Sequence, residues 1–431
     1  MTKIDAGGGA PSRREFIKTT TAAGAALMAT GNYAFGQATG KLRVALIGCG
    51  GRGTGAAAQA LSADPGAVLT AMGDVFKDHI DSSLANLKAE SIGAKVEVTA
   101  ANCFVGLDNY RKVLDTNVDV VLLTTPPGFR PLHIKAAVDA GKHIFAEKPM
   151  GADAAGVRAA YEAAKGAAAK KLAFVAGFCW RYDNPRRAFY QKIHEGAIGS
   201  VRHVQATYLT GPVKPMPPAE SRPAGVSDTE WQIRNWYNFV WLCGDGLIEQ
   251  ACHSVDKILW AMRDVPPLRC VATGGRDLPN GEGNIYDHID VFYEWPDGVR
   301  ATMAQRQIPC QYNDNSDYIA GSKGHAFIKG WNTLEIHGDT VQKFEGPNRM
   351  YQQEHDELFA SIRKGTPIDN SERMWRSTLV GLMGRMAAYT GEEITWDQML
   401  KSQEKLFPEH LDWNGKLAIA PMAIPGQTKY V

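Results

Sequence analysis

One stretch near residue 48 limits the fold of this chain more than any other, because an apolar run there meets a glycine-rich turn and then a helix. The run Leu42–Ile47 is followed by Gly-Cys-Gly-Gly-Arg-Gly and by a row of small residues. Gly48 permits the tight turn, Gly50 lets the backbone approach a pyrophosphate, and Gly53 lets the helix pack close to the strand. A lone pattern of this kind also occurs in flexible loops, so the surrounding sequence must show whether it is a dinucleotide-binding turn.

The surroundings favour a dinucleotide site. A second predicted strand, Val68–Gly73, ends in Asp74, 21 residues beyond Gly53. An acidic side chain at this place can accept hydrogen bonds from both ribose hydroxyls of adenosine and repels a 2′-phosphate. Lys77 is near, but no arginine follows directly. We therefore expect NAD as the cofactor and favour it over NADP.

Strands and helices alternate up to residue 177, which predicts a nucleotide-binding domain over residues 39–177. The continuous apolar run 119–125 is typical of a parallel strand buried on both faces. A shorter strand is expected at Lys95–Thr99. The loop that starts at Thr125 and Pro126 would lie at the carboxyl edge of the sheet, where such folds bind ligands. Another strand leads to Glu147, Lys148 and a proline that ends it.

From residue 178 onward, strands follow one another without intervening helices, which predicts an α+β domain with a largely antiparallel sheet over residues 178–431. A single helix is expected over Gly246–Met262, after a cluster of aromatic residues between Trp231 and Trp241. The proline-rich stretch 212–223 reads as a long surface loop and a possible lid. The tail after Phe407 has no assignment.

Composition excludes several classes of protein. A chain of 431 residues is longer than one core usually spans, so two domains are expected. Lys plus Arg (47) nearly balances Asp plus Glu (46), which gives no electrostatic case for a nucleic-acid partner. No apolar run is long enough for a membrane span. The seven scattered cysteines contain no CxxC pair, so we expect small buried side chains instead of disulfides or a metal site.

The N-terminus reads as an export signal. Residues 12–18, Ser-Arg-Arg-Glu-Phe-Ile-Lys, match a twin-arginine motif, and a weakly apolar stretch and small residues follow. The alternative is an arginine pair that opens a disordered tail. We predict a signal peptide over residues 1–38 and a periplasmic protein. Because such substrates cross the membrane folded, the cofactor would be loaded in the cytoplasm.

The chemistry-bearing residues lie on both sides of the domain boundary. Glu249 and His253 would share one face of the predicted helix, one turn apart, with Asp256 a further turn on. A neutral imidazole can accept the proton of a hydroxyl that is being oxidised, and the Lys148 cation can stabilise the developing alkoxide. The alternative for His253 is a structural histidine satisfied by Glu249. A zinc site is disfavoured because no second histidine lies four residues away.

Each of the other candidate site residues has two interpretations. Glu147 could bond the nicotinamide ribose or be a solvated charge at a strand end. Arg181 and Tyr182 could reach the substrate, or form an inter-domain salt bridge. Trp236 and Tyr237 could stack on a sugar, or belong to a core or subunit interface. The predicted cofactor residues are Gly48, Gly50, Gly51, Arg52, Gly53, Asp74, Thr125, Pro126, Glu147 and Lys148. The predicted substrate residues are Arg181, Tyr182, Trp236, Tyr237 and Asp256.

Taken together, these motifs resemble the Gfo/Idh/MocA oxidoreductase family over residues 41 to 400. The likeness is carried by GCGGRG at 48–53, TPP at 125–127, AGKHIFAEKP at 140–149, RY at 181–182, GAIG at 196–199, ExxxHxxD at 249–256 and GEEITWDQML at 391–400. It implies a Rossmann domain, a second domain with an open-faced sheet, and a homodimer or homotetramer. It also implies that Lys148 is the active-site lysine and that Glu249 and His253 match the family's acid and histidine. Here Glu249 stands in place of the more usual aspartate.

The resemblance and the export signal together predict an exported enzyme with tightly bound NAD. Its expected reaction is oxidation or reduction of a hydroxyl or keto group of a sugar or glycoside, at C3. The alternative is a glycoside hydrolase that uses NAD for transient oxidation and elimination. A binding module without activity is disfavoured, because Lys148, Glu249 and His253 would then have no function.

Overall fold

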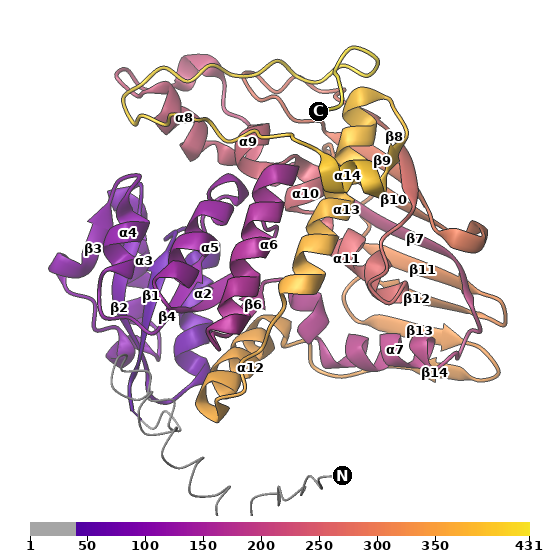
Figure 1. Cartoon of the computed structure of the whole chain (residues 1–431), viewed down its shortest axis with the longest axis horizontal. Coiled ribbons are helices and arrows are strands. Elements are labelled where there is room, and N and C mark those ends of the chain that lie inside the picture. Colours follow the sequence, from indigo (N-terminus) through magenta and orange to yellow (C-terminus); the bar gives the residue numbers. More distant parts are fainter. Residues whose placement is uncertain (1–39) are drawn as a thin grey trace, which may run out of the picture. The chain divides into compact units, whose positions relative to one another are not determined.

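The computed structural model describes residues 40–431, which contain two β-sheets and the helices packed on them (Figure 1). The predicted signal peptide, residues 1–38, lies outside the described residues. Within residues 40–431, no helix is both long and apolar enough to cross a membrane. The seven cysteines are free, and five are buried as expected, but Cys103 is partly exposed and Cys310 exposed.

The first sheet has six strands in the order β3-β2-β1-β4-β5-β6, and all neighbouring strands run parallel. This is the doubly wound order of dinucleotide-binding domains, so the predicted Rossmann fold is confirmed. The strands are β1 (Leu42–Ile47), β2 (Ala67–Asp74), β3 (Cys103–Val105), β4 (Val120–Leu123), β5 (His143–Ala146) and β6 (Phe174–Ala176). All four residues of β4 are buried, because helices cover both faces of the sheet.

The helices of this domain are α2 (Gly51–Ala63), α3 (Lys77–Ala89), α4 (Asn109–Leu114), α5 (Arg130–Asp139) and α6 (Ala154–Ala169). A helix from far along the chain joins them. α12 (Met350–Lys364) buries Leu358 and Phe359 in the same apolar core as Leu46, and its Arg363 pairs with Asp64 at 2.6 Å. The nucleotide-binding fold therefore includes a segment of the C-terminal half.

One predicted strand is wrong. Residues Lys95–Thr99 form no strand; a 3-10 turn occupies Gly93–Lys95, and Val96 makes only an isolated bridge to Leu69. β3 begins after a second turn, at Cys103, and pairs with the end of β2. The alternating apolar residues Val96 and Val98 are buried in the core, which explains why the stretch resembles a strand in sequence.

The second sheet has nine strands in the order β14-β13-β12-β11-β7-β10-β9-β8-β15. Only β7 and β10 run parallel, so the expected largely antiparallel sheet is confirmed. The strands are β7 (Val201–Thr210), β8 (Arg269–Gly275), β9 (His288–Glu294), β10 (Arg300–Gln307), β11 (Ser316–Gly321), β12 (His325–Lys329), β13 (Thr333–His337), β14 (Val341–Lys343) and β15 (Ile394–Thr395). Buried and exposed residues alternate along β9 and β10, which is the pattern of a sheet covered on one face.

The helices of the C-terminal half are α7 (Asn184–His194), α8 (Asp228–Arg234), α9 (Val240–Cys243), α10 (Gly246–Glu249), α11 (Cys252–Ala261), α13 (Ser371–Thr390) and α14 (Trp396–Lys401). α13 covers the buried face of the second sheet, with Leu379 and Met383 in its core. Close approach is possible because a Cβ at Gly384 would lie 2.8 Å from Val291 and from the Tyr293 hydroxyl.

The helix predicted over Gly246–Met262 is broken into α10 and α11. In an unbroken helix the His253 N–H would donate to the Glu249 carbonyl, four residues back. Lys148 Nζ takes that carbonyl instead, and the His253 N–H donates to the Gln250 carbonyl at 3.4 Å. Glu249 and His253 therefore do not lie on one continuous helix face, and the free Glu249 carbonyl accepts from a residue of the other domain.

Candidate active site

The glycine loop between β1 and α2 is held in the expected form. Gly48 has φ +97°, and its N–H donates to the Gly73 carbonyl at 2.8 Å. A Cβ at Gly53 would lie 2.0 Å from the Gly48 carbonyl, so the helix start requires glycine there. By contrast, a Cβ at Gly50 or Gly51 would meet no atom within 4 Å. The loop thus presents bare backbone to open space, which is the geometry that suits a pyrophosphate.

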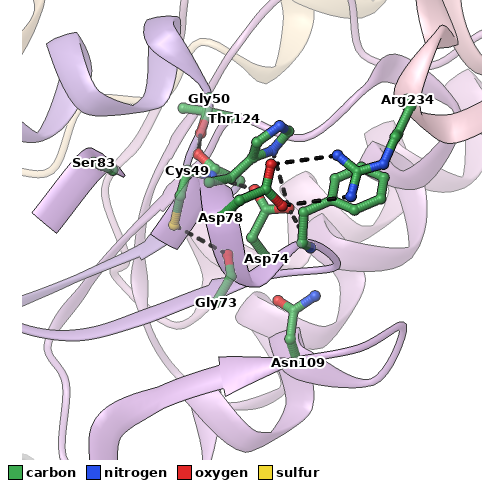
Figure 2. A network of polar contacts seen from close by, with 12 residues as sticks. Cys49, Gly50, Gly73, Asp74, Asp78, Ser83, Asn109, Thr124 and Arg234 are labelled. Carbon is green, nitrogen blue, oxygen red and sulfur yellow. Dashed lines mark hydrogen bonds and ion pairs between the residues drawn. The ribbon is translucent and has the colours of Figure 1, made fainter. Parts of the chain in front are cut away.

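Asp74 stands at the end of β2, beside this loop (Figure 2). One carboxylate oxygen accepts the Cys49 N–H at 2.6 Å and the other accepts the Phe76 N–H at 2.9 Å. The His79 ring lies 3.4 Å from the second oxygen. Two backbone donors therefore fix a negative charge at the wall of the cavity in front of the glycine loop. This position leaves the carboxylate at the cavity wall, where the ribose of an adenosine could reach it.

Residues of the second domain lie along one side of this cavity. The Arg234 guanidinium, at the end of α8, lies 3.9 Å from the centre of the Phe76 ring and 3.3 Å from Asp78 (Figure 2). Ile233 and Trp236 of the second domain line the cavity itself. The adenosine side of the site therefore depends on contacts made across the two domains.

The C-terminal tail holds α8 in place. Figure 1 shows the tail running beside α8 and α9. Thr229 donates to the Asp412 carbonyl at 2.7 Å, and Gln232 donates to the Leu417 carbonyl at 2.8 Å. The Trp413 ring packs edge-on against Phe76, with centres 5.6 Å apart. The tail, which had no assignment from sequence, thus packs behind Phe76, a residue that lines the first cavity.

A second cavity, of about 690 Å³, continues from the first. Arg52, Thr124, Thr125 and Trp236 line both, so an extended ligand can pass from one to the other. This volume lies within the range of about 300–1,000 Å³ that is common for small-molecule sites. The second cavity is lined by Glu147, Lys148, Glu249 and His253, which the sequence singled out, and by several aromatic side chains.

Lys148 crosses from the first domain to the second. It follows β5, precedes a cis peptide bond to Pro149, and donates to both the main-chain carbonyl and Oε1 of Glu249, the latter at 3.1 Å. Burial alone would lower the pKa of Lys148, but the neighbouring Glu249 charge and weaker negative neighbours raise it above its ordinary value. Lys148 is therefore a cation at the cavity wall.

His253 has the opposite electrostatics. Burial and the positive charges of Lys148, Lys257 and Arg52 hold the pKa of its imidazole well below the ordinary value. The ring packs edge-on against Phe178, and its Nδ1 has no hydrogen-bond partner among residues 40–431. The structure thus places a neutral histidine in the same cavity as a lysine cation. Glu249 contacts the lysine instead of the histidine, so it does not orient His253 directly.

Two further residues belong to this network. Gln250 donates to Glu249 Oε2 at 2.8 Å, and the Tyr208 hydroxyl donates to Gln250 Oε1 at 2.6 Å. Burial raises the pKa of Tyr208 to about 12, so its hydroxyl keeps its proton. Gln250 was not among the site residues predicted from the sequence, although it directly follows Glu249. Tyr208 lies on a strand whose sequence has no motif that marks a site.

Glu147 and Arg52 face each other at the junction of the two cavities. Arg52 donates to Glu147 through Nε and lies 3.2 Å from Glu354 of α12. Behind them, buried Arg130 donates to the carbonyls of Thr125 and Pro149 and so ties together the loops after β4 and β5. Pro126 lies at the wall of the first cavity. All ten predicted cofactor residues line one or both cavities.

The predicted substrate residues divide into two groups. Trp236 and Tyr237 line the second cavity. Arg181 and Asp256 do not, because they form a buried pair in which Nε and Oδ2 are 2.8 Å apart. Tyr182 is also turned away and donates to Asn370 at 2.7 Å. For these three residues, the predicted contact with substrate does not match their positions.

The Arg181 pair links the two domains. Arg181 follows β6, whereas Asp256 lies on α11, and Asp264 and Ser377 add bonds of 2.5 Å and 2.7 Å to the same cluster. This is the inter-domain salt bridge that the sequence left open as an alternative. Residues 40–431 contain no group of three or more His, Cys, Asp or Glu side chains that could hold a metal ion.

The joined cavities can hold an extended dinucleotide with a small polar molecule beside one end, which is the arrangement of a dehydrogenase. Comparison with family models makes this more specific. Residues 42–175 match the model described as an oxidoreductase family with an NAD-binding Rossmann fold, and residues 187–327 match the GFO/IDH/MocA C-terminal domain. This chain belongs to the Gfo/Idh/MocA oxidoreductase family, and its N-terminal domain is an NAD-binding Rossmann domain.

Its relatives act on polyols and sugars. An inositol 2-dehydrogenase of Acidiphilium cryptum is 30% identical over 67% of this chain and 74% of its own length. An inositol 2-dehydrogenase of Rhizobium meliloti is 24% identical over 76% of this chain and 90% of its own length. Among solved structures, an aldose-aldose oxidoreductase from Caulobacter crescentus has a TM-score of 0.64 at 19% identity, covering 82% of this chain and 99% of the other.

Proposed function

We propose that this chain is an exported oxidoreductase that interconverts a hydroxyl and a keto group of a sugar or glycoside, with NAD kept tightly bound. The observation that carries the proposal is the pairing of a lysine cation with a neutral histidine in one cavity. That cavity opens onto the glycine loop and Asp74 through shared lining residues. The polyol and sugar relatives support the substrate class. Oxidation at C3 rests on the family resemblance.

The protein's own residues fit each part of the reaction. The bare backbone at Gly50 and Gly51 leaves room for the phosphates of NAD, and Asp74 suits the adenosine ribose. When bound, NAD supplies the hydride acceptor. His253 takes the hydroxyl proton, and Lys148 stabilises the negative charge that develops on the oxygen. Glu249 keeps Lys148 protonated and fixes its position.

Tight binding of NAD is supported by the cover over the first cavity. Ile233 and Trp236 of the second domain line that cavity, and Arg234 and Trp413 pack on Phe76, which also lines it, so we expect slow release of the cofactor. Export supports the same conclusion, because no free nicotinamide pool is expected outside the cytoplasm. The hydride taken from the sugar must then pass from the cofactor to a second substrate that carries a keto group. The similar Caulobacter crescentus structure is that of an aldose-aldose oxidoreductase, whose name describes such an exchange.

Localisation and assembly are further parts of the proposal. The motif at residues 12–18 supports twin-arginine export, and cell fractionation of the Arg13→Lys, Arg14→Lys double variant tests it. Assembly as a dimer or tetramer is supported by the uncovered face of the second sheet. There Val271, Phe292 and Tyr318 are between 43% and 48% exposed. Light scattering of the purified protein measures the assembly.

The function is tested with protein to which no cofactor is added. Mass spectrometry of the small molecules released on denaturation should identify NAD. Inositols, aldoses and aryl glycosides are then mixed separately with the intact protein. A true substrate should convert bound NAD to NADH once, and turnover should begin when a keto sugar is supplied. NMR of the product identifies the oxidised carbon.

Lys148→Ala should bind NAD but form no NADH, whereas Lys142→Ala is the matched control because Lys142 donates to the Val118 carbonyl and lines neither cavity. Release of phenol from an aryl glycoside without oxidised sugar would instead identify the hydrolase. Failure of every polyol and sugar to reduce the bound cofactor would refute the proposal.

A further inference from the structure

The wall of the second cavity carries a pair of tryptophans that the reaction above does not use. Trp180 lies just after β6, and Trp331 lies in the turn between β12 and β13. Both line the cavity that holds Lys148. Their rings are 4.7 Å apart and inclined by 41°. Trp180 is 4% exposed and Trp331 is 53% exposed, so Trp180 is the buried lower ring and Trp331 is the accessible upper ring of one aromatic surface.

A buried ion pair holds this surface in place. Arg186 pairs with Asp183 at 2.6 Å, and both side chains are 1% exposed. The Arg186 guanidinium lies 3.9 Å from the centre of the Trp180 ring and donates to the Trp331 carbonyl at 3.0 Å. One arginine therefore supports the lower ring and the backbone of the turn that carries the upper ring. A surface fixed in advance loses little conformational entropy when a ligand binds.

A purely structural reading explains Trp180 but not Trp331. Burying an indole stabilises a core, yet half of the Trp331 side chain remains open and lines a cavity. An open aromatic face with a few polar groups nearby is the usual lining of a small-molecule site. Asn315 supplies such a group on the same wall. Its Oδ1 accepts from Lys257 at 3.2 Å, which leaves the amide NH2 for a ligand.

We propose that the surface of Trp180 and Trp331 binds a second pyranose ring, so that the substrate is a disaccharide or a larger glycoside. The C–H face of a pyranose is apolar and flat enough to lie on an indole, while its hydroxyls reach groups such as Asn315. The ring that is oxidised lies at Lys148 and His253, and the attached ring lies on Trp331. This inference rests on the proposed sugar oxidoreductase activity and extends it.

Binding and turnover are measured with two matched sets of probes. One set is D-glucose, cellobiose, maltose and phenyl β-D-glucoside, and the other is D-galactose, lactose and phenyl β-D-galactoside. Calorimetry of the NAD-loaded protein gives binding, and NADH formation gives kcat/KM. At least one disaccharide should bind more tightly than its monosaccharide. Trp331→Ala should weaken binding of that disaccharide about tenfold and change the affinity for the monosaccharide less than about twofold.

Trp375→Ala is the matched control, because Trp375 stacks on Tyr161, 4.7 Å away, and lines neither cavity. Trp331→Phe should recover part of the lost affinity. The inference is overturned if no disaccharide binds more tightly than its monosaccharide, or if Trp331→Ala affects both alike. Loss confined to the phenyl glycosides would also overturn it. Calorimetry needs no turnover, so disaccharide binding without NADH formation would count against the proposed function and leave this inference standing.

Discussion

Lys148 Nζ lies 3.1 Å from Glu249 Oε1 and also donates to the main-chain carbonyl of the same residue. One ammonium group therefore neutralises a carboxylate and occupies a backbone acceptor that a continuous helix would use. The helix is interrupted there, and α11 begins at Cys252, with His253 at the cavity wall. Lys148 and His253, the proposed catalytic pair, thus lie beside a contact between the two domains.

Removal of the Glu249 charge should move the alkaline limit of activity. Lys148 acts as a cation, and its pKa is raised by Glu249 against the lowering effect of burial. Activity should therefore persist to high pH in the wild type and fall only as pH rises through the raised pKa. In Glu249→Gln the alkaline limb of kcat/KM should move down by about 1–3 pH units. Glu357→Gln, whose partner Arg187 lies outside both cavities, is the control. An unmoved limb would mean that another group sets it.

His253 should be active in its neutral form well below neutral pH. Burial and nearby cations lower its pKa, so protonation requires more acid than the usual value of about 6.5. The wild-type kcat/KM should stay level through that region. His253→Ala should lose about 10²- to 10⁴-fold in kcat while it retains NAD. His194→Ala, which removes a contact to the Trp260 carbonyl, should have little effect. An acid limb near the ordinary histidine value that disappears in His253→Ala would contradict this assignment.

Asp74 should decide between NAD and NADP. Its carboxylate is fixed by the N–H groups of Cys49 and Phe76, so it cannot swing away from a 2′-phosphate. Asp74→Ser should bind NAD about tenfold more weakly, and NADP at least tenfold more tightly, than the wild type does. Titration of cofactor-free protein with both dinucleotides measures the two constants. Asp81→Ser, on the exposed face of α3, is the control. Equal discrimination in Asp74→Ser and wild type would disprove the role of the carboxylate.

The first domain could be predicted because its signals are local. The apolar run of β1, the turn at Gly48 and the acid at Asp74 follow one another within a single βαβ unit. The strand predicted at Lys95–Thr99 failed for the same reason. Val96 and Val98 alternate as in a strand, yet only the pairing with β2 decides where β3 begins.

The site could be predicted only in part because its geometry is made by distant residues. Nothing near Glu249 indicates that Lys148, 101 residues earlier, takes its carbonyl. Arg181 next to a strand end looks available to a ligand in sequence, but Asp256 and Asp264 enclose it in the fold. Trp331 lines the second cavity from a turn that carries no motif, and the tail packs on Phe76 from a stretch that carries none either.

Arg181 should prove to hold the domains together instead of binding substrate. Its pair with Asp256 is 3% and 1% exposed, and removal of one partner leaves a buried charge. Arg181→Met should therefore lower the free energy of unfolding by about 3–5 kcal/mol. Among molecules that stay folded and NAD-loaded, KM should change less than about twofold. Arg187→Met, which breaks a partly exposed pair with Glu357, should cost at most about 1 kcal/mol. Denaturant unfolding and steady-state kinetics measure the two effects. A large rise in KM without loss of stability would restore Arg181 to the substrate site.

The tail should slow the release of NAD. Trp413 packs against Phe76, the ring that Arg234 also covers, and Phe76 lines the first cavity. An edge-to-face aromatic contact contributes about 0.5–1.5 kcal/mol, so Trp413→Ala should release NAD about three- to tenfold faster. Exchange of bound NAD for isotopically labelled NAD gives the rate. Trp396→Ala is the control, because Trp396 packs on Trp375, away from both cavities. If the two variants release NAD at the same rate, the tail's contact with Phe76 does not retain the cofactor. A faster exchange in Trp413→Ala alone would assign the C-terminal tail a direct part in cofactor retention.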